Sequence, residues 1–134
     1  EVHACVRRAT LARLVTVDDG GVLRVVRLAF LEFAQHGARY AFPPIWGSPA
    51  RGMTTGYAAP PLRELIVQSG ELPPVWPDPE GQTRGITLLP LYATVPFAAS
   101  RDQLLYECLA LLDALRAGAA RERELAADLL QARL

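Results

Sequence analysis

The chain has 134 residues, 51% of them hydrophobic, and its fourteen basic side chains balance fourteen acidic ones. A chain of this length forms one domain, or a small module with an appendage. It is long enough to bury about two thirds of its unfolded surface, so it needs no metal or disulfide to hold its fold. No apolar run approaches the roughly 20 residues of a membrane-spanning helix, and no secretory signal is visible. We therefore exclude a transmembrane helix in this sequence and expect a cytoplasmic protein with no membrane partner.

All of the basic side chains are arginine, and their charge is unevenly balanced along the chain. Residues 1–51 carry seven arginines against four acids, a net charge of +3, whereas residues 52–134 carry seven against ten, a net charge of −3. Guanidinium groups bind phosphate and guanine in a planar, two-pronged geometry. The N-terminal end is therefore suited to an anionic partner.

The first stretch, residues 1–14, has the spacing of an amphipathic helix with a basic outer face. Its apolar stripe is Val2, Cys5, Val6 and Ala9, and its basic face is His3, Arg7 and Thr10 with Arg8 beside them. The pattern is already running at Glu1, which is not a methionine, so we expect further residues upstream. We expect the stripe to be buried, and Cys5 and Cys108 to be reduced core thiols rather than a disulfide or a metal pair.

Two short apolar segments then flank a turn. Residues 14–17 and 22–25 surround Asp18-Asp19-Gly20-Gly21, in which Asp19-Gly20 is a favoured pair for a type I′ turn. Both central positions of that turn need a positive φ, which aspartate tolerates and glycine prefers. The pattern predicts a β-hairpin.

The densest apolar run follows the hairpin. Val26–His36 predicts a helix that is apolar around most of its circumference and must therefore be buried. Gly37 is expected to end this helix in the left-handed conformation. Ala38–Phe42 then alternates small and aromatic side chains, as a short strand does.

The middle of the chain is rich in proline, because all eleven prolines fall between Pro43 and Pro96. Together with the glycines they exclude long helices here, apart from a short one over Pro61–Gln68. The segment nevertheless contains too many aromatic and aliphatic side chains to stay solvated. We expect an ordered, loop-rich cap with a short strand at Gly85–Leu89.

The end of the chain predicts two helices. Ser100 and Gln103 have the spacing of a capping box, and the helix that follows runs to Ala117 with its leucines inward. Gly118 breaks this helix, and Ala119–Arg133 forms a last one. The two helices pair as an antiparallel hairpin, or they offer a leucine-rich face to a second copy in a homodimer.

These elements together predict an α+β fold. Residues 1–44 have the order helix, hairpin, helix, which is that of the second half of a winged helix-turn-helix unit, so this unit is partial. The proline-rich cap (45–99) and the C-terminal helical hairpin (100–134) complete one compact domain overall.

Catalytic residues are not apparent. The chain has two histidines and no HExxH, GxSxG, CxxC, P-loop or dinucleotide motif. Asp78 and Glu80 stand in a proline-bracketed turn, where they are turn formers rather than an acid–base pair. We expect no enzyme activity, no cofactor and no metal site. Trp46, Tyr57 and Tyr92 either line a ligand pocket between the cap and the helices or belong to the core.

The strongest functional signal is the basic first helix. The candidate DNA-binding residues, one of them in the hairpin, are His3, Arg7, Arg8, Thr10, Arg13 and Arg24. On a recognition helix Arg7 and Thr10 would face base edges, and the other arginines would hold phosphates. The acidic tip Asp18-Asp19 would be repelled by phosphates, so Arg24 should make any contact from the hairpin. The alternative is a solvated surface helix with no role in binding nucleic acid.

Several blocks of the sequence resemble one family. They read EVHACVRRATLARLV, LAFLEFAQHGARYAFPP, RGMTTGYAAPPL and VWPDPEGQTRGITLLPLYATVP. The chain is similar over nearly its whole length to a group of bacterial proteins classed with winged helix-turn-helix or MarR-like regulators. The resemblance implies two further helices before Glu1 and makes the helix over residues 1–14 the third, DNA-reading one. It also implies a regulator or antitoxin-like partner encoded beside a nucleotidyltransferase-like protein.

Two functions compete. The first is a transcription regulator that binds double-stranded DNA as a homodimer through residues 100–134. The second is a protein-interaction or antitoxin-like module without catalysis. In that case the acidic half of the chain and the aromatic anchors Trp46 and Trp76 hold a partner protein encoded nearby.

Overall fold

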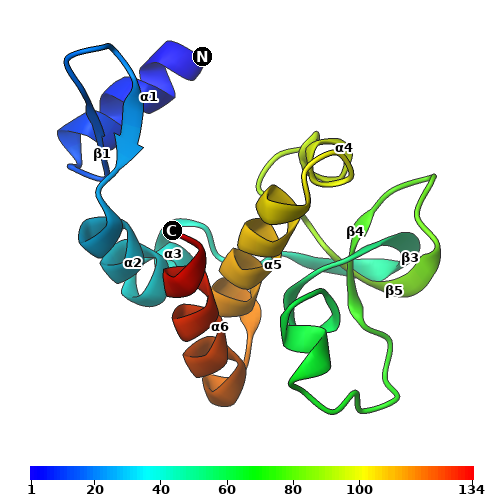
Figure 1. Ribbon diagram of the computed structural model, residues 1–134. Coiled ribbons are helices and arrows are strands. Elements are labelled where there is room, and N and C mark those ends of the chain that lie inside the picture. Colours follow the sequence, from blue (N-terminus) through cyan, green and yellow to red (C-terminus); the bar gives the residue numbers. More distant parts are fainter.

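In the computed structural model, which describes residues 1–134, the two C-terminal helices form an antiparallel pair in the middle of the molecule (Figure 1). These are α5 (Gln103–Ala117) and α6 (Ala120–Arg133). On one side they pack against α2 (Arg27–His36) and α3 (Ala38–Ala41), and on the other side α5 meets a small sheet and its short helices. The predicted α+β class and the predicted helical hairpin are confirmed.

The first turn of α5 is capped by Asp102, whose carboxylate accepts a backbone N–H hydrogen bond at 3.1 Å. The capping box predicted at Ser100 and Gln103 is wrong, because the residues just before it form a helix of their own, α4 (Val95–Ala99). The Ser100 hydroxyl donates to the Phe97 carbonyl at 2.7 Å within that turn. The chain becomes extended only at Asp102, which is the conformation that an N-cap residue needs.

Gly118 ends α5, as predicted, and turns the chain into α6. Its φ and ψ of −77° and 162° are extended. The Glu122 carboxylate then caps α6 by accepting a hydrogen bond from the Ala119 N–H at 2.6 Å. This short connection places the two helices side by side.

The main core lies between α2, α5 and α6. Its buried side chains are Ala34, Leu62, Leu111, Ala114, Leu115, Ala126 and Leu130. The inward leucines predicted for α5 are thus confirmed in its second half, but Leu104 and Leu105 are 54% and 38% exposed, which corrects the prediction for the first turn. The reason is the length of α6, which ends opposite Glu107, where Arg133 forms an ion pair at 2.9 Å. The first turn of α5 extends past that point.

The proline-rich segment forms a closed sheet of three strands, β3 (Trp46–Thr54), β4 (Pro74–Pro77) and β5 (Thr83–Leu88). β3 pairs antiparallel with both other strands, and β4 pairs parallel with β5. The strands approach closely where glycine allows it, since a Cβ on Gly52 would lie 1.9 Å from the Trp76 carbonyl oxygen. The ordered cap and one strand of it, β5, are confirmed, whereas the sequence pattern does not predict β3.

Two single turns of 3-10 helix, η1 (Gly56–Ala58) and η2 (Leu62–Glu64), connect β3 to β4. The helix predicted over Pro61–Gln68 is wrong beyond that second turn. Most of its remaining residues are exposed, and a short helix without tertiary packing is unstable. A second core cluster joins this region to α4 and α5 through Ala59, Trp76, Val95, Ala99, Tyr106 and Ala110.

The N-terminal unit, residues 1–25, projects from the rest of the molecule on the side away from the closed sheet (Figure 1). It contains α1 (Val2–Leu11) and a hairpin of β1 (Val15–Val17) and β2 (Leu23–Val25). The predicted hairpin is confirmed. The helix predicted over residues 1–14 ends three residues earlier, because the chain leaves the helical conformation and Arg13 has a φ of +59°.

The hairpin turn is not of type I′, which corrects the prediction. Gly21 is its one residue with a positive φ, +80°, and the Asp18 carbonyl accepts a hydrogen bond from the Gly21 N–H at 2.9 Å. The Asp18 carboxylate also accepts from the N–H groups of Gly20 and Val22, at 3.0 and 2.9 Å. These side-chain bonds favour a three-residue loop in which a single glycine takes the left-handed conformation.

The apolar stripe of α1 stays on the surface. α1 has no buried residue, Val2 is 75% exposed, and Cys5 is exposed while Cys108 is half-buried. The prediction of a buried stripe and of two core thiols is therefore wrong for α1. Its main contacts are with β1, and no further layer of the described chain covers the stripe.

The helix α2 begins directly after the hairpin, with Val26 as its N-cap residue. The Val26 N–H donates to the Leu14 carbonyl at 2.8 Å, and the Val26 carbonyl accepts from the Phe30 N–H at 2.9 Å. Val26 therefore takes part both in the last hydrogen bond of the hairpin and in the first hydrogen bond of α2. The prediction that α2 is buried around most of its circumference is wrong. The helix packs on the body along one side, where Ala34 is buried, whereas Leu28 is 80% exposed.

Gly37 joins α2 to α3 with a φ of −116°, so the predicted left-handed stop is wrong. The strand predicted over Ala38–Phe42 is the short helix α3, whose first residue is buried. Packing of α3 on α5 overrides the local alternation of side chains. None of the helices is long and apolar enough to cross a membrane.

Candidate nucleic-acid interface

One face of α1 gathers basic side chains that the sequence analysis singles out. His3, Arg7 and Arg8 line a hollow on the surface together with Ala4 and Leu11. His3 and Arg7 are four residues apart, so they lie on consecutive turns of the same helix face. All three basic side chains are exposed. The structure therefore brings His3, Arg7 and Arg8 together on one accessible surface.

The arginines of this face have no carboxylate partner. The ion pairs of the molecule are Arg24–Asp18, Arg116–Asp113 and Arg133–Glu107. Arg8 makes one side-chain contact, from Nη2 to the Cys5 sulfur at 3.5 Å. Guanidinium groups in this state keep their donors free for phosphate oxygens or base edges.

Three of the predicted residues are placed less favourably. The Thr10 hydroxyl donates to the Val6 carbonyl at 2.8 Å, which leaves it able to accept a hydrogen bond but not to donate one. Arg13 lies beyond the end of α1 and is therefore not part of its basic face. Arg24 forms an ion pair with Asp18 at 3.2 Å, so part of its binding capacity is already used.

The carboxylate of Asp18 holds the hairpin tip. The hydrogen bond from the Val22 N–H has the largest effect and lowers the pKa of Asp18. Desolvation, the next largest effect, opposes it, and the Arg24 side chain and the Gly20 N–H lower the pKa further. Asp18 therefore stays ionised at neutral pH. Its negative charge makes the tip an unfavourable place for a phosphate group.

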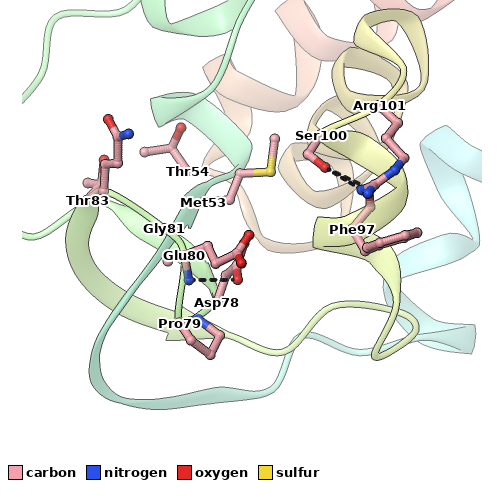
Figure 2. A pocket seen from close by; sticks show the side chains of 12 residues that line it. Met53, Thr54, Asp78, Pro79, Glu80, Gly81, Thr83, Phe97, Ser100 and Arg101 are labelled. Carbon is pink, nitrogen blue, oxygen red and sulfur yellow. Dashed lines mark hydrogen bonds between the residues drawn. The ribbon is translucent and has the colours of Figure 1, made fainter.

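A separate cleft of about 710 Å³ lies between the turn after β4 and the end of α4 (Figure 2). Asp78 and Glu80 lie on one wall, and Figure 2 shows Arg101 on the opposite wall, near Phe97. The Asp78 carboxylate accepts a hydrogen bond from the Glu80 N–H at 3.1 Å, which is the contact of a turn. The Arg101 guanidinium lies 3.6 Å from the centre of the Phe97 ring. No group of three or more His, Cys, Asp or Glu side chains gathers here or elsewhere to hold a metal ion.

One buried polar cluster was not predicted as a site. It contains Trp76, which is 1% exposed, so the prediction that Trp76 anchors a partner protein is wrong. Asp113, 2% exposed, accepts hydrogen bonds at 2.7 Å from both the Thr55 hydroxyl and the Trp76 indole N–H. Its other oxygen accepts from Arg116 Nε and Nη2 at 3.1 and 2.8 Å, and Arg116 Nη1 donates to the Phe42 carbonyl at 2.7 Å. The cluster ties α5 to the sheet. Its signal in the sequence is an acid and a base three residues apart within a leucine-rich helix.

No protein-family model, no curated protein and no solved structure matches the chain. The resemblance to winged helix-turn-helix regulators therefore stays a prediction.

Proposed function

We propose that the chain is a DNA-binding module of winged helix-turn-helix type, part of a transcription regulator, which reads DNA with α1. The observation that carries the proposal is the exposed face of α1. It presents His3, Arg7 and Arg8 side by side with no carboxylate partner, on a helix that has no buried residue.

The dimensions of α1 suit the major groove. A helix of ten residues is about 15 Å long, and the major groove of B-DNA is about 12 Å wide and admits a helix. In this proposal Arg7 makes a bidentate contact with guanine, and Arg8 and His3, on either side of it, contact phosphates. The hairpin follows α1 directly, as the wing follows the recognition helix in this class of protein.

The hairpin contributes less than α1 in this proposal. The Asp18 carboxylate at the tip would repel phosphate, and its ion pair with Arg24 competes with a phosphate contact. We therefore expect the tip to stay away from the DNA backbone. Arg13, at the base of the hairpin, is free to make a contact that does not depend on sequence.

The test measures binding of the chain to fluorescent double-stranded DNA from its own promoter at two salt concentrations. The logarithm of affinity should fall with the logarithm of salt concentration by about 0.9 for each phosphate neutralised. Arg7→Ala should lower the preference for specific over random DNA by about 1–3 kcal/mol, and Arg13→Ala should weaken all sequences alike. The matched control is Arg121→Ala, because Arg121 is an exposed arginine on α6. This substitution should change neither the affinity for DNA nor the preference for specific sequences.

Affinity that is indifferent to salt, or an equal loss in the Arg7→Ala and Arg121→Ala variants, would contradict the proposal.

The homodimer through residues 100–134 is a further part of the proposed function. Most leucines of α5 and α6 are used inside the chain, so Leu104 and Leu105 are the exposed leucines left for such a contact. Sedimentation at two protein concentrations tests this part.

A protein-interaction module is the second candidate, and the cleft in Figure 2 favours it. Phe97 at its edge is 62% exposed, and large exposed aromatic side chains are frequent anchors of protein interfaces. On this hypothesis Phe97→Ala abolishes capture of a specific partner from the source cell, while Arg7→Ala leaves it intact. Loss of capture in the Arg7→Ala variant alone would contradict this hypothesis, because it would locate the partner-binding surface on α1 and not in the cleft.

A further inference from the structure

A smaller cavity lies where the closed sheet meets the turn between α5 and α6. Its volume is about 190 Å³, and its lining includes Trp46, Tyr57, Leu88, Asp113, Ala117 and Glu122. Trp46 and Leu88 are paired across β3 and β5, so the sheet supplies one wall and the helical turn supplies the other. The sequence left open whether Trp46, Tyr57 and Tyr92 line such a pocket, and the structure places the first two of them there.

The volume of the cavity sets the size of an occupant. An apolar cavity of about 150 Å³ holds a benzene molecule, whereas ligands of drug size need about 300–1,000 Å³. The cavity therefore fits a body of one ring or a short aliphatic chain. Leu88 and Ala117 supply apolar surface for such a body.

The charges of the lining are unbalanced toward the negative side. It contains two carboxylates and no lysine, arginine or histidine. Arg123 lies outside the lining, and its Nη1 donates to the carbonyl of the lining residue Gly118 at 3.0 Å. Asp113 is already matched by Arg116 at 2.8 Å.

Glu122 belongs to no ion pair, and one of its oxygens accepts from the Ala119 N–H at 2.6 Å, which occupies the first turn of α6. The carboxylate of Glu122 would therefore repel an anion. It also already accepts the hydrogen bond from the Ala119 N–H, so this donor at the start of α6 is not free to bind an anion.

The aromatic side chains add to the preference for a cation. Trp46 is 48% exposed, which leaves part of its surface open to an occupant. Burial, and then the charge of Glu122, raises the pKa of Tyr57, so its phenol stays neutral at physiological pH. Aromatic rings attract a cation through their quadrupole, and the attraction grows when the site is partly shielded from water.

We infer that this cavity binds a small organic cation, an ammonium group carried on a one-ring or short aliphatic body. The ammonium group lies toward Glu122 and the aromatic side chains, and the apolar body lies toward Leu88 and Ala117. The inference goes beyond DNA binding and does not depend on it. A neutral ligand of the same shape would gain the apolar contacts alone.

The experiment titrates the whole chain with benzylammonium and, separately, with benzyl alcohol, its uncharged analogue. Backbone amide NMR signals of Trp46, Tyr57 and Gly118 report occupancy of the cavity. We expect these signals to shift saturably with benzylammonium and the affinity to be about tenfold higher than for benzyl alcohol.

The variant Glu122→Gln separates charge from folding, because glutamine keeps an oxygen that can cap α6. It should lose the roughly tenfold preference for benzylammonium and leave the affinity for benzyl alcohol unchanged. Glu124→Gln is the matched control, since Glu124 is exposed on the same helix and does not line the cavity. This control should keep the preference.

Equal affinity for the two probes in the unaltered chain would overturn the inference, because it would indicate an apolar cavity with no charge preference. Shifts that map to other residues, or that do not saturate below roughly 10 mM, would overturn it as well. Loss of the preference for benzylammonium in both Glu122→Gln and Glu124→Gln would also overturn the inference. The preference would then arise from the overall negative charge of α6 and not from Glu122.

Discussion

The helix α1 of the N-terminal unit and the helix α5 of the body use arginine in opposite ways. On α1 the guanidinium groups of Arg7 and Arg8 are exposed and have no carboxylate partner. In the body Arg116 is 6% exposed, and all three of its side-chain nitrogens donate, to Asp113 and to the Phe42 carbonyl. A guanidinium group buried as deeply as that of Arg116 must have its charge and its donors matched inside the fold, whereas an exposed one such as that of Arg7 can stay available to an external anion.

The largest expected effect comes from removing the buried acid. Asp113→Ala should lower the free energy of unfolding by about 3–5 kcal/mol, because it leaves the Arg116 charge buried without compensation. It also leaves the donors of Thr55 and Trp76 unpaired. Urea unfolding at neutral pH, followed by circular dichroism, measures the loss.

The control for this variant is Asp128→Ala, an exposed acid on α6 whose removal should change stability by less than about 0.5 kcal/mol. A similar loss in the two variants would mean that the buried cluster contributes no more to stability than a solvated carboxylate. The contrast between the two regions would then not reflect burial.

A pair of leucines tests the same contrast without charge. Leu111 is fully buried in α5, and its replacement by alanine should lower stability by about 2–5 kcal/mol. Leu11 in α1 is 77% exposed, and Leu11→Ala should change stability by less than about 0.5 kcal/mol. Chemical denaturation gives both values, and a large loss for Leu11→Ala would show that α1 is packed more tightly than its exposure indicates.

The smallest expected effect is a pH dependence confined to the N-terminal unit. The pKa of Asp18 is lowered from 3.8 in the fold, chiefly by its hydrogen bond from the Val22 N–H. The carboxylate therefore stabilises the hairpin fully above pH 3.8, and this contribution is lost as the pH falls through the lowered pKa. Amide NMR shifts of Gly20 and Val22 during an acid titration report it.

Asp18→Asn is the control for this titration, because the amide oxygen still accepts hydrogen bonds but does not ionise. The acid-induced shifts at Gly20 and Val22 should disappear in this variant. Their persistence would assign the pH dependence to another carboxylate of the N-terminal unit.

Local signals in the sequence were sufficient for some elements. The hairpin follows from two apolar segments around an Asp-Gly turn, and the break between α5 and α6 follows from Gly118. The turn type did not follow, because it depends on the Asp18 side chain accepting from two backbone N–H groups. Local spacing predicts that a turn forms, whereas the competing hydrogen bonds decide its geometry.

Elements that depend on distant contacts could not be predicted in this way. β3 contains Gly47, Pro49 and Gly52, which argue against a strand when read locally. In the structure Gly52 is required where β3 approaches the Trp76 backbone. The basic face of α1 could be predicted from helical spacing. The cavity beside Glu122 could not, because its lining comes from six separate elements and one connecting residue, Gly118.

The joint at Val26 has a consequence for binding two partners at once. A flexible linker would spread the second of two binding events over many relative positions and so dilute its effective concentration. Val26 is committed to hydrogen bonds on both sides, with Leu14 in the hairpin and Phe30 in α2. The φ and ψ of Val26 lie between these two bonds, so rotation about Val26 can move α1 relative to the body without breaking either of them. A second contact, from the Tyr92 hydroxyl to the Glu1 carboxylate at 2.8 Å, holds α1 at one separation and one angle to the body. A partner that touches both surfaces either matches this spacing or breaks the bond between Tyr92 and Glu1.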